Sequence, residues 1–98
     1  MSDLRIEWDE RKNAANKRKH AVSFEEAETV FYDDRAILTQ DPDDEQEEDR
    51  FLLLGLSAGL RTLVVCHCYR EAEDVIRIIS ARKAHREERR DYDKRWRR

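Results

Sequence analysis

Three apolar segments in the second half of the chain, separated by very short connections, constrain its fold most strongly. They read RFLLLGLS, RTLVVCHCY and DVIRIISA, at residues 50–57, 61–69 and 74–81. Short apolar runs of this length that are bounded by turn residues predict strands. The connections AGL and REAE are so short that successive strands must form antiparallel hairpins. We expect Gly59 to supply a positive φ in the first connection.

The first half of the chain predicts a strand followed by two helices. The alternating segment LRIEWD, residues 4–9, predicts a short strand at a sheet edge. Asp9 is placed to cap a helix over residues 10–20, in which Ala14 and Ala15 are the main apolar residues. Ser23 and Glu26 match the capping box of a second helix. One face of that helix is apolar and carries Phe24, Ala27, Val30 and Phe31, with Val22 placed to pack against it.

A further strand and a basic helix complete the expected order of elements. RAILTQ, residues 35–40, predicts a strand, and the acidic segment 41–49 predicts an exposed loop because its like charges repel. A last helix is expected from around Arg82, with Ala84, Tyr92 and Trp96 as its docking residues. Residues 1–98 therefore predict one α+β domain, β-α-α-β-β-β-α. Two N-terminal helices would cover one face of an antiparallel sheet, and the C-terminal basic helix part of the other.

Charge is segregated along the chain. The net charge is −3, yet residues 33–49 hold nine acidic residues and a single base. Residues 77–98 hold ten bases and four acids. A basic segment in an acidic chain indicates a polyanionic partner. The chain has no apolar run long enough for a membrane and no signal-like start, so we expect a cytoplasmic protein without membrane contact.

Several candidate site residues have two interpretations. His67 interrupts an apolar strand, so it is either a hydrogen-bonded core group or an acid or base on an open surface. Arg77 either pairs with a carboxylate or meets a phosphate. The arginines of the last helix either pair with nearby acids on a solvated surface or contact the phosphates of a polyanion. Alternation along a strand places Cys66 and Cys68 on the face opposite His67, so these three residues predict no metal site, and no cofactor is expected.

Three stretches together resemble a known family, the BrnT toxins of bacterial type II toxin-antitoxin systems. They are EWDERKNAANKRKHAVSFEEAETVF, DRFLLLGLSAGLRTLVVCHCYR and VIRIISARKAHREERRDY, between residues 7 and 92. The resemblance implies a RelE-like fold and cleavage of RNA that arrests translation. It also implies a BrnA-like antitoxin, whose ribbon-helix-helix domain binds operator DNA while the toxin acts as co-repressor. Ala21 departs from the pattern, which has glycine there.

The resulting hypothesis is a metal-independent endoribonuclease in which the 2′-hydroxyl of the RNA attacks the adjacent phosphate. This reaction needs a base, an acid, and cations for the charged phosphorane. The candidate catalytic residues are His67, Arg77, Arg82, Glu88, Arg89 and Tyr92. His67 or Glu88 would act as base or acid and the three arginines would stabilise charge. Tyr92 would stack on a base or transfer a proton.

The remaining candidates are expected to bind RNA through its phosphates. They are Lys17, Lys19, His20, Arg70, Lys83 and Arg86, and His20 with Lys19 can also complete the catalytic site from the first helix. The alternative function is a non-catalytic basic subunit of a repressor complex, which binds nucleic acid or protein. The sequence also leaves a homodimer open.

Overall fold

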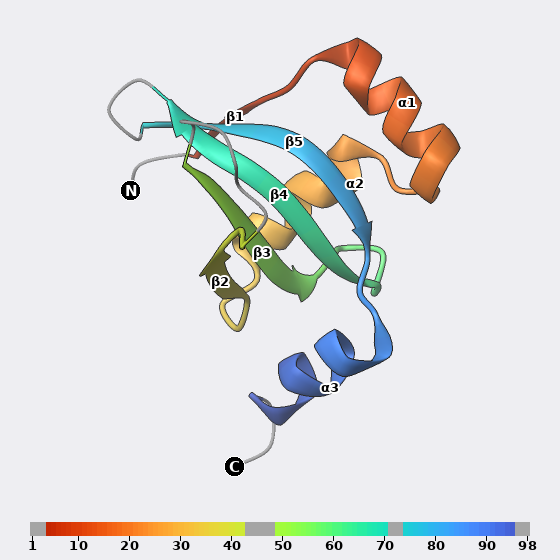
Figure 1. Cartoon of the computed structure of the whole chain (residues 1–98), viewed down its shortest axis with the longest axis vertical. Coiled ribbons are helices and arrows are strands. Elements are labelled where there is room, and N and C mark those ends of the chain that lie inside the picture. The colour runs from red at the N-terminus through yellow and green to blue at the C-terminus, as the bar shows by residue number, and fades with distance from the viewer. Residues whose placement is uncertain (1–3, 43–48, 71–73, 96–98) are drawn as a thin grey trace.

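A central sheet dominates the computed structural model, which describes residues 4–42, 49–70 and 74–95 (Figure 1). Its five strands are β1 (Arg5–Glu7), β2 (Ile37–Gln40), β3 (Arg50–Leu56), β4 (Thr62–Arg70) and β5 (Val75–Lys83), in the spatial order β1-β5-β4-β3-β2. The helices are α1 (Glu10–His20), α2 (Phe24–Thr29) with the 3₁₀ turn η1 (Val30–Tyr32), and α3 (Arg86–Lys94). The order β-α-α-β-β-β-β-α has one strand more than the expected β-α-α-β-β-β-α, and each of the five strands corresponds to a segment that the sequence predicts as a strand. Trp96 and residues 43–48 of the acidic loop lie outside the described residues.

The hairpins β3–β4 and β4–β5 are antiparallel, as their short connections predict, and β2 pairs with β3 in the same sense. The pairing of β1 with β5 is parallel and differs from the expected all-antiparallel sheet. Nearly the whole chain separates these two strands, so no hairpin sets their direction. Parallel pairing requires a long connection of this kind.

Helix α2 lies over one face of the sheet and α1 lies beside β5, and the main core forms between α2, η1 and the central strands (Figure 1). The predicted apolar face of α2 and η1 is confirmed, because Phe24, Ala27 and Val30 are fully buried. They pack with sheet residues such as Leu53 and Val65. Each fully buried large apolar side chain contributes about 1.5–3 kcal/mol to folding.

Helix α1 packs through asparagines, which the sequence analysis did not anticipate. Asn13 and Asn16 are 1% and 7% exposed, whereas Ala15 is exposed. The side-chain oxygen of Asn13 accepts a hydrogen bond from the Phe24 N–H at 2.9 Å, and its Nδ2 donates to Glu25 at 2.9 Å. Hydrogen bonds therefore dock a helix that has almost no apolar surface.

The caps of α1 and α2 follow the sequence with one exception. The Asp9 carboxylate accepts from the Arg11 N–H at 2.8 Å, and the Ser23 hydroxyl accepts from the Glu26 N–H at 3.0 Å. The carboxylate of Glu26 does not complete the capping box. It accepts from Ser57 at 2.6 Å and from Arg61, so its charge ties α2 to the β3–β4 turn.

The predicted start of the last helix, around Arg82, is wrong. Strand β5 continues through Lys83 because Arg82 and Lys83 still pair with Val64 and Leu63 of β4. Helix α3 begins after His85, whose N–H donates to the Glu88 carboxylate at 2.8 Å. Among the described helices, none is long and apolar enough to cross a membrane.

The prediction that Gly59 has a positive φ is also wrong, because Leu60 takes that conformation with φ of 63°. The Leu60 N–H donates to Ser57 O and the Ser57 N–H to Arg61 O, both at 2.9 Å. This pattern is a three-residue hairpin loop, in which a type I turn precedes a left-handed residue. The loop length therefore sets the left-handed position one residue after the glycine.

Candidate functional site

The sheet face opposite α2 carries two adjoining cavities, of about 250 and 200 Å³, which together we call the groove. Leu52 and Val64 line both cavities and form their shared floor. The polar residues of the larger cavity are His20, Asp41, Arg50, Cys66, Ser80 and Arg82. The smaller cavity adds Glu88 and Asp91 of α3 and a mostly apolar wall.

Strand register brings the groove residues together. Val64 pairs with Arg82, and Cys66 pairs with both Ser80 and Leu52. Side chains of paired residues project from the same face, opposite the core residues that alternate with them. Sequence reasoning did not single out Arg50 or Asp41. Alternation along β3 indicated which face of the sheet Arg50 lies on. The residues that surround it depend on the strand register, which the sequence did not determine.

His20 reaches the same cavity from the C-terminal end of α1. The helix ends there because Ala21 adopts the left-handed conformation, with φ of 59° and ψ of 32°. The Ala21 N–H donates to Lys17 O at 3.0 Å, which closes the last turn. The turn after α1 therefore forms with alanine where the family pattern has glycine, at a steric cost of about 1–2 kcal/mol.

Arg82 lies between the groove and α3. Its Nη1 and Nη2 donate to the two carboxylate oxygens of Glu88, at 2.8 and 3.0 Å. The guanidinium lowers the pKa of Glu88, which the His85 N–H also lowers, against the opposing effect of burial. Glu88 therefore stays ionised and joins the first turn of α3 to the end of β5.

His67 lies on the other face of the sheet and is fully buried. Its ring packs edge-on against Phe31 at 4.8 Å between centroids, and its Nδ1 lies 3.1 Å from Val65 O. Burial is the main cause that lowers the pKa of His67, and the hydrogen bond to Val65 opposes it. The structure thus matches the core interpretation of this histidine and separates it from the groove.

Arg77 and Arg70 lie toward the other end of the sheet. Nη1 of Arg77 donates to the Glu7 carboxylate at 2.7 Å, across the β1–β5 pair. Five residues of strand separate Arg77 from Arg82, which is roughly 16 Å. Arg70 is exposed at the end of β4. The structure does not bring either residue into the groove.

Tyr92 anchors α3 to the rest of the molecule. It is 3% exposed, and its hydroxyl donates to the Asp33 carboxylate at 2.6 Å. Burial raises the pKa of Asp33, but hydrogen bonds from the Leu56 N–H and from Tyr92 outweigh it and leave the pKa low. Nη1 of Arg89 donates a hydrogen bond to Ala84 O at 2.8 Å, which links α3 to the segment just before it.

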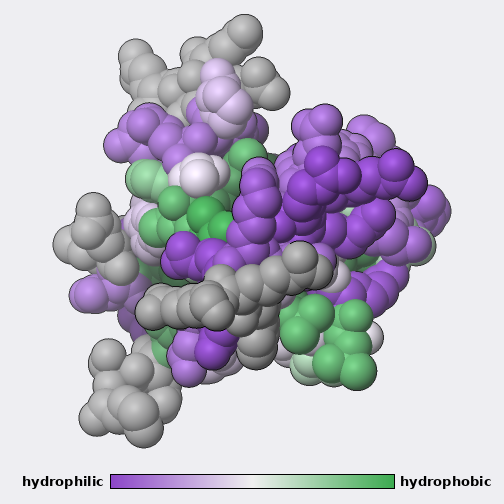
Figure 2. Space-filling model, turned by 90° about the horizontal axis from the view of Figure 1, so that it is seen from below, coloured by the Kyte–Doolittle hydropathy of each residue, from purple (hydrophilic) through white to green (hydrophobic). Residues whose placement is uncertain are grey.

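The other predicted RNA contacts are exposed on elements around the groove. Lys17 and Lys19 lie on α1, Lys83 ends β5, and Arg86 begins α3. Seen from the α3 end, hydrophilic residues cover most of the molecule and hydrophobic atoms emerge in separate patches (Figure 2). None of these four residues lines the two cavities of the groove, and Arg86 lines a separate pocket on α3 with Arg89, Arg90, Asp93 and Lys94.

The two cysteines lie on the face opposite His67, as strand alternation predicts. Burial is the main cause that raises the pKa of Cys66 to about 11, and the Asp41 charge adds to it. The Cys66 Sγ lies 3.8 Å from Asp41 Oδ2. The thiol therefore stays protonated and is a poor nucleophile in the groove.

Comparison with known proteins gives a family and a fold. The model of the family described as "Ribonuclease toxin, BrnT, of type II toxin-antitoxin system" matches residues 8–88. Among solved structures, the chain is similar to the crystal structure of the Brucella abortus ribonuclease toxin BrnT, with a TM-score of 0.65 and 24% identity. The similarity covers 86% of this chain and 100% of that chain. No match was found among curated proteins.

Proposed function

This chain belongs to the BrnT family of ribonuclease toxins of type II toxin-antitoxin systems, and we propose that it cleaves RNA in the groove. One observation carries the proposal: Arg82 and His20, from two distant segments, line the same cavity. Arginine is a permanent cation suited to phosphate, and histidine exchanges protons near neutral pH. Phosphoryl transfer needs both kinds of group.

The proposed reaction is an attack by the RNA 2′-hydroxyl on the neighbouring phosphorus, which expels the 5′-oxygen and leaves a 2′,3′-cyclic phosphate. Arg82 donates to the non-bridging phosphate oxygens, whose charge grows in the transition state. His20 moves one proton, either from the attacking hydroxyl or to the leaving oxygen, and water exchanges the other proton. No metal takes part in this scheme.

RNA must displace Glu88 from Arg82 in this scheme. The carboxylate holds the guanidinium through two hydrogen bonds, which is the arrangement that a phosphate uses. A phosphate entering the larger cavity competes for the same donors. His67 is excluded from the proposed site because it is buried on the opposite face. In this proposal, Tyr92 and Arg89 hold α3 beside the groove through their hydrogen bonds.

The exposed bases around the groove guide the rest of the RNA in this proposal. Lys17, Lys19, Lys83 and Arg86 contact phosphates on either side of the cleaved one, and Arg70 and Arg77 extend this surface along the sheet. The biological proposal is inhibition of translation in the cytoplasm. A BrnA-like ribbon-helix-helix antitoxin neutralises the toxin, and the complex represses its own operon through operator DNA.

The direct test incubates the purified chain with RNA in EDTA and identifies the fragment ends. We expect ends with cyclic phosphate from the wild type and a loss of about 100-fold or more in rate for Arg82→Ala. Arg90→Ala is the matched control, since it removes an exposed arginine of α3 outside the groove. Cleavage only after a divalent ion is added contradicts the metal-independent scheme. Absence of fragments, with or without ribosomes, favours the non-catalytic basic subunit instead.

A further inference from the structure

The proposed site joins two segments that no regular hydrogen-bond pattern holds together. His20 ends α1, whereas Arg82 lies in β5. We infer that Asn16 is a positioning residue, whose side-chain amide holds the end of α1 against β5 and so sets the distance between His20 and Arg82. The catalytic meaning of this inference rests on the proposed function.

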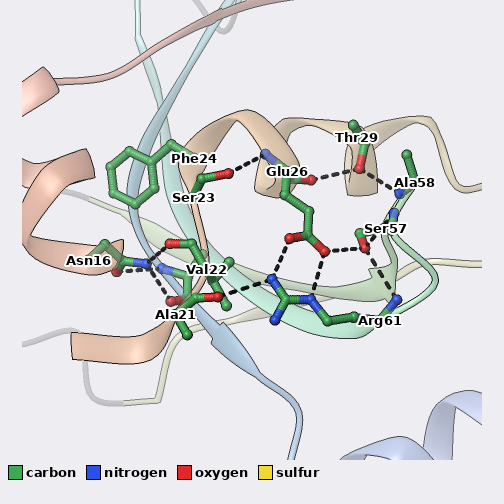
Figure 3. A network of polar contacts seen from close by, with 12 residues as sticks. Asn16, Ala21, Val22, Ser23, Phe24, Glu26, Thr29, Ser57, Ala58 and Arg61 are labelled. Carbon is green, nitrogen blue, oxygen red and sulfur yellow. Dashed lines mark hydrogen bonds and ion pairs between the residues drawn. The ribbon is translucent and has the colours of Figure 1, made fainter. Parts of the chain in front are cut away.

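The amide of Asn16 contacts both segments at once. Its Nδ2 donates to Val22 O and to Ala81 O, both at 2.8 Å, and its Oδ1 accepts from the Ala81 N–H at 3.1 Å. Figure 3 shows the Asn16 side chain pointing toward Val22, with dashed lines for its hydrogen bonds. A side-chain amide has two N–H donors and one oxygen, so every polar atom of Asn16 is engaged.

Ala81 needs such a partner because β5 extends beyond β1. Strand β1 pairs with Val75, Ile76 and Arg77, and in the described part of the chain no strand pairs with the outer edge of β5 beyond Arg77. Buried backbone groups on an uncovered edge require hydrogen bonds. Asn16 supplies a donor and an acceptor to the same residue, as a neighbouring strand does.

The bonded residues are the chain neighbours of the two proposed site residues. Ala81 immediately precedes Arg82, and Val22 follows His20 by two residues. A second contact supports the same turn, because Nη2 of Arg61 donates to Ala21 O at 3.1 Å (Figure 3). A displacement of about 1 Å between reacting groups lowers a rate by as much as about 100-fold. Without the Asn16 amide, the distance between His20 and Arg82 would no longer be fixed.

Asn13 is a matched control for the structural part of this role. It lies on the same helix and is buried like Asn16, and it also bonds through its amide. Its partners are Phe24 and Glu25 of α2, both at 2.9 Å, and Glu10 of α1 at 3.5 Å, so none of these hydrogen bonds contacts β5. Substitution of Asn13 therefore weakens packing without loosening His20 from Arg82.

The test compares Asn16→Ala, Asn16→Asp and Asn13→Ala in the full chain. Thermal unfolding reports stability, and RNA cleavage reports kcat and KM separately. We expect both Asn16 variants to lower kcat by about 10- to 100-fold with a smaller change in KM, and Asn13→Ala to retain kcat despite lower stability. Asn16→Asp keeps the acceptor for the Ala81 N–H but loses both donors and buries a charge, so Asn16→Gln, a neutral amide that is one methylene longer, decides the matter if neither Asn16→Ala nor Asn16→Asp folds.

A second readout does not depend on RNA cleavage. In NMR spectra, the ring signal of His20 should move when Arg82→Gln is introduced into the wild type or Asn13→Ala, and should not respond in Asn16→Ala. Unchanged kcat in the folded Asn16 variants, or an equal loss in Asn13→Ala, overturns the inference. If the wild type cleaves no RNA, the proposed function fails. The His20 signal then decides alone, and a response that persists in Asn16→Ala overturns the positioning role.

Discussion

Glu88 accepts two hydrogen bonds, of 2.8 and 3.0 Å, from the guanidinium of Arg82, and this ion pair connects the groove to α3. The same carboxylate caps α3 by accepting from the His85 N–H. The Glu88 side chain therefore affects both phosphate binding at Arg82 and the position of α3. This link makes Glu88 the residue whose substitution is most informative about the groove.

Glu88→Gln should lower KM for RNA and change kcat by less than about three-fold, since it weakens a competitor of phosphate and leaves the cap in place. The lowered pKa of Glu88 supports this expectation, because an ionised carboxylate paired with arginine is a weak base. Steady-state cleavage kinetics measure both constants. A large loss of kcat at unchanged KM would instead assign proton transfer to Glu88.

His67→Phe should retain RNA cleavage, because the ring is buried away from the groove. It should also reduce the pH dependence of stability. Since the folded pKa lies below the ordinary value of 6.5, the unfolded chain binds the proton first as pH falls. The wild type therefore loses stability from this histidine as pH drops below 6.5 toward the folded pKa. Urea unfolding at several pH values tests this, and a slope equal to that of wild type in His67→Phe contradicts it.

Tyr92→Phe should destabilise the fold by about 1.5–3 kcal/mol, because the ring stays in place while Asp33 loses a hydrogen bond to its charged carboxylate. Urea unfolding gives the change in free energy. Hydrogen exchange along α3 gives its location, with faster exchange expected there than in α1. Tyr32→Phe is the control, since Tyr32 is 61% exposed. Equal stability of Tyr92→Phe and Tyr32→Phe would show that the Asp33 contact does not anchor α3.

Ala21→Gly should stabilise the protein by about 1 kcal/mol, because glycine adopts the left-handed conformation without a Cβ clash. The position has φ of 59° and is exposed, so no packing is lost. Ala15→Gly, at an exposed site inside the same helix, should destabilise by about 0.5–1 kcal/mol. Chemical denaturation of the two variants should therefore give changes of opposite sign.

Gly55→Ala should destabilise by about 1–3 kcal/mol through overpacking. An added Cβ would lie 2.8 Å from Val30 Cγ1 and 3.0 Å from Ala36 Cβ, both inside the packed region. At Gly59 the added Cβ would meet the Glu26 carboxylate at 2.9 Å. That carboxylate is held by Ser57 and Arg61 and must shift with them, but Gly59 is exposed and no core residue has to move, so Gly59→Ala should still cost less. Thermal unfolding of both variants tests the order, and a larger loss at Gly59 would reverse it.

Local sequence patterns predicted most of the secondary structure and much of the core. The hairpins, the Asp9 and Ser23 caps and the apolar face around Phe24 depend on neighbouring residues alone, because loop length and periodicity act over a few positions. The errors occur where distant residues compete. Glu26 bonds Arg61 instead of its own helix end, and β5 extends past Arg82 because β4 continues to pair with it.

The sequence by itself determined which residues carry charge, which segments become strands and which family the chain resembles. Tertiary structure decided which of those charges meet. It buried His67 on one face and paired Arg77 with Glu7 at one end of the sheet, and at the other end it brought His20 and Arg82 to the same cavity. The reason is that strand alternation assigns a face locally, whereas strand register and helix docking depend on contacts between residues far apart in the chain.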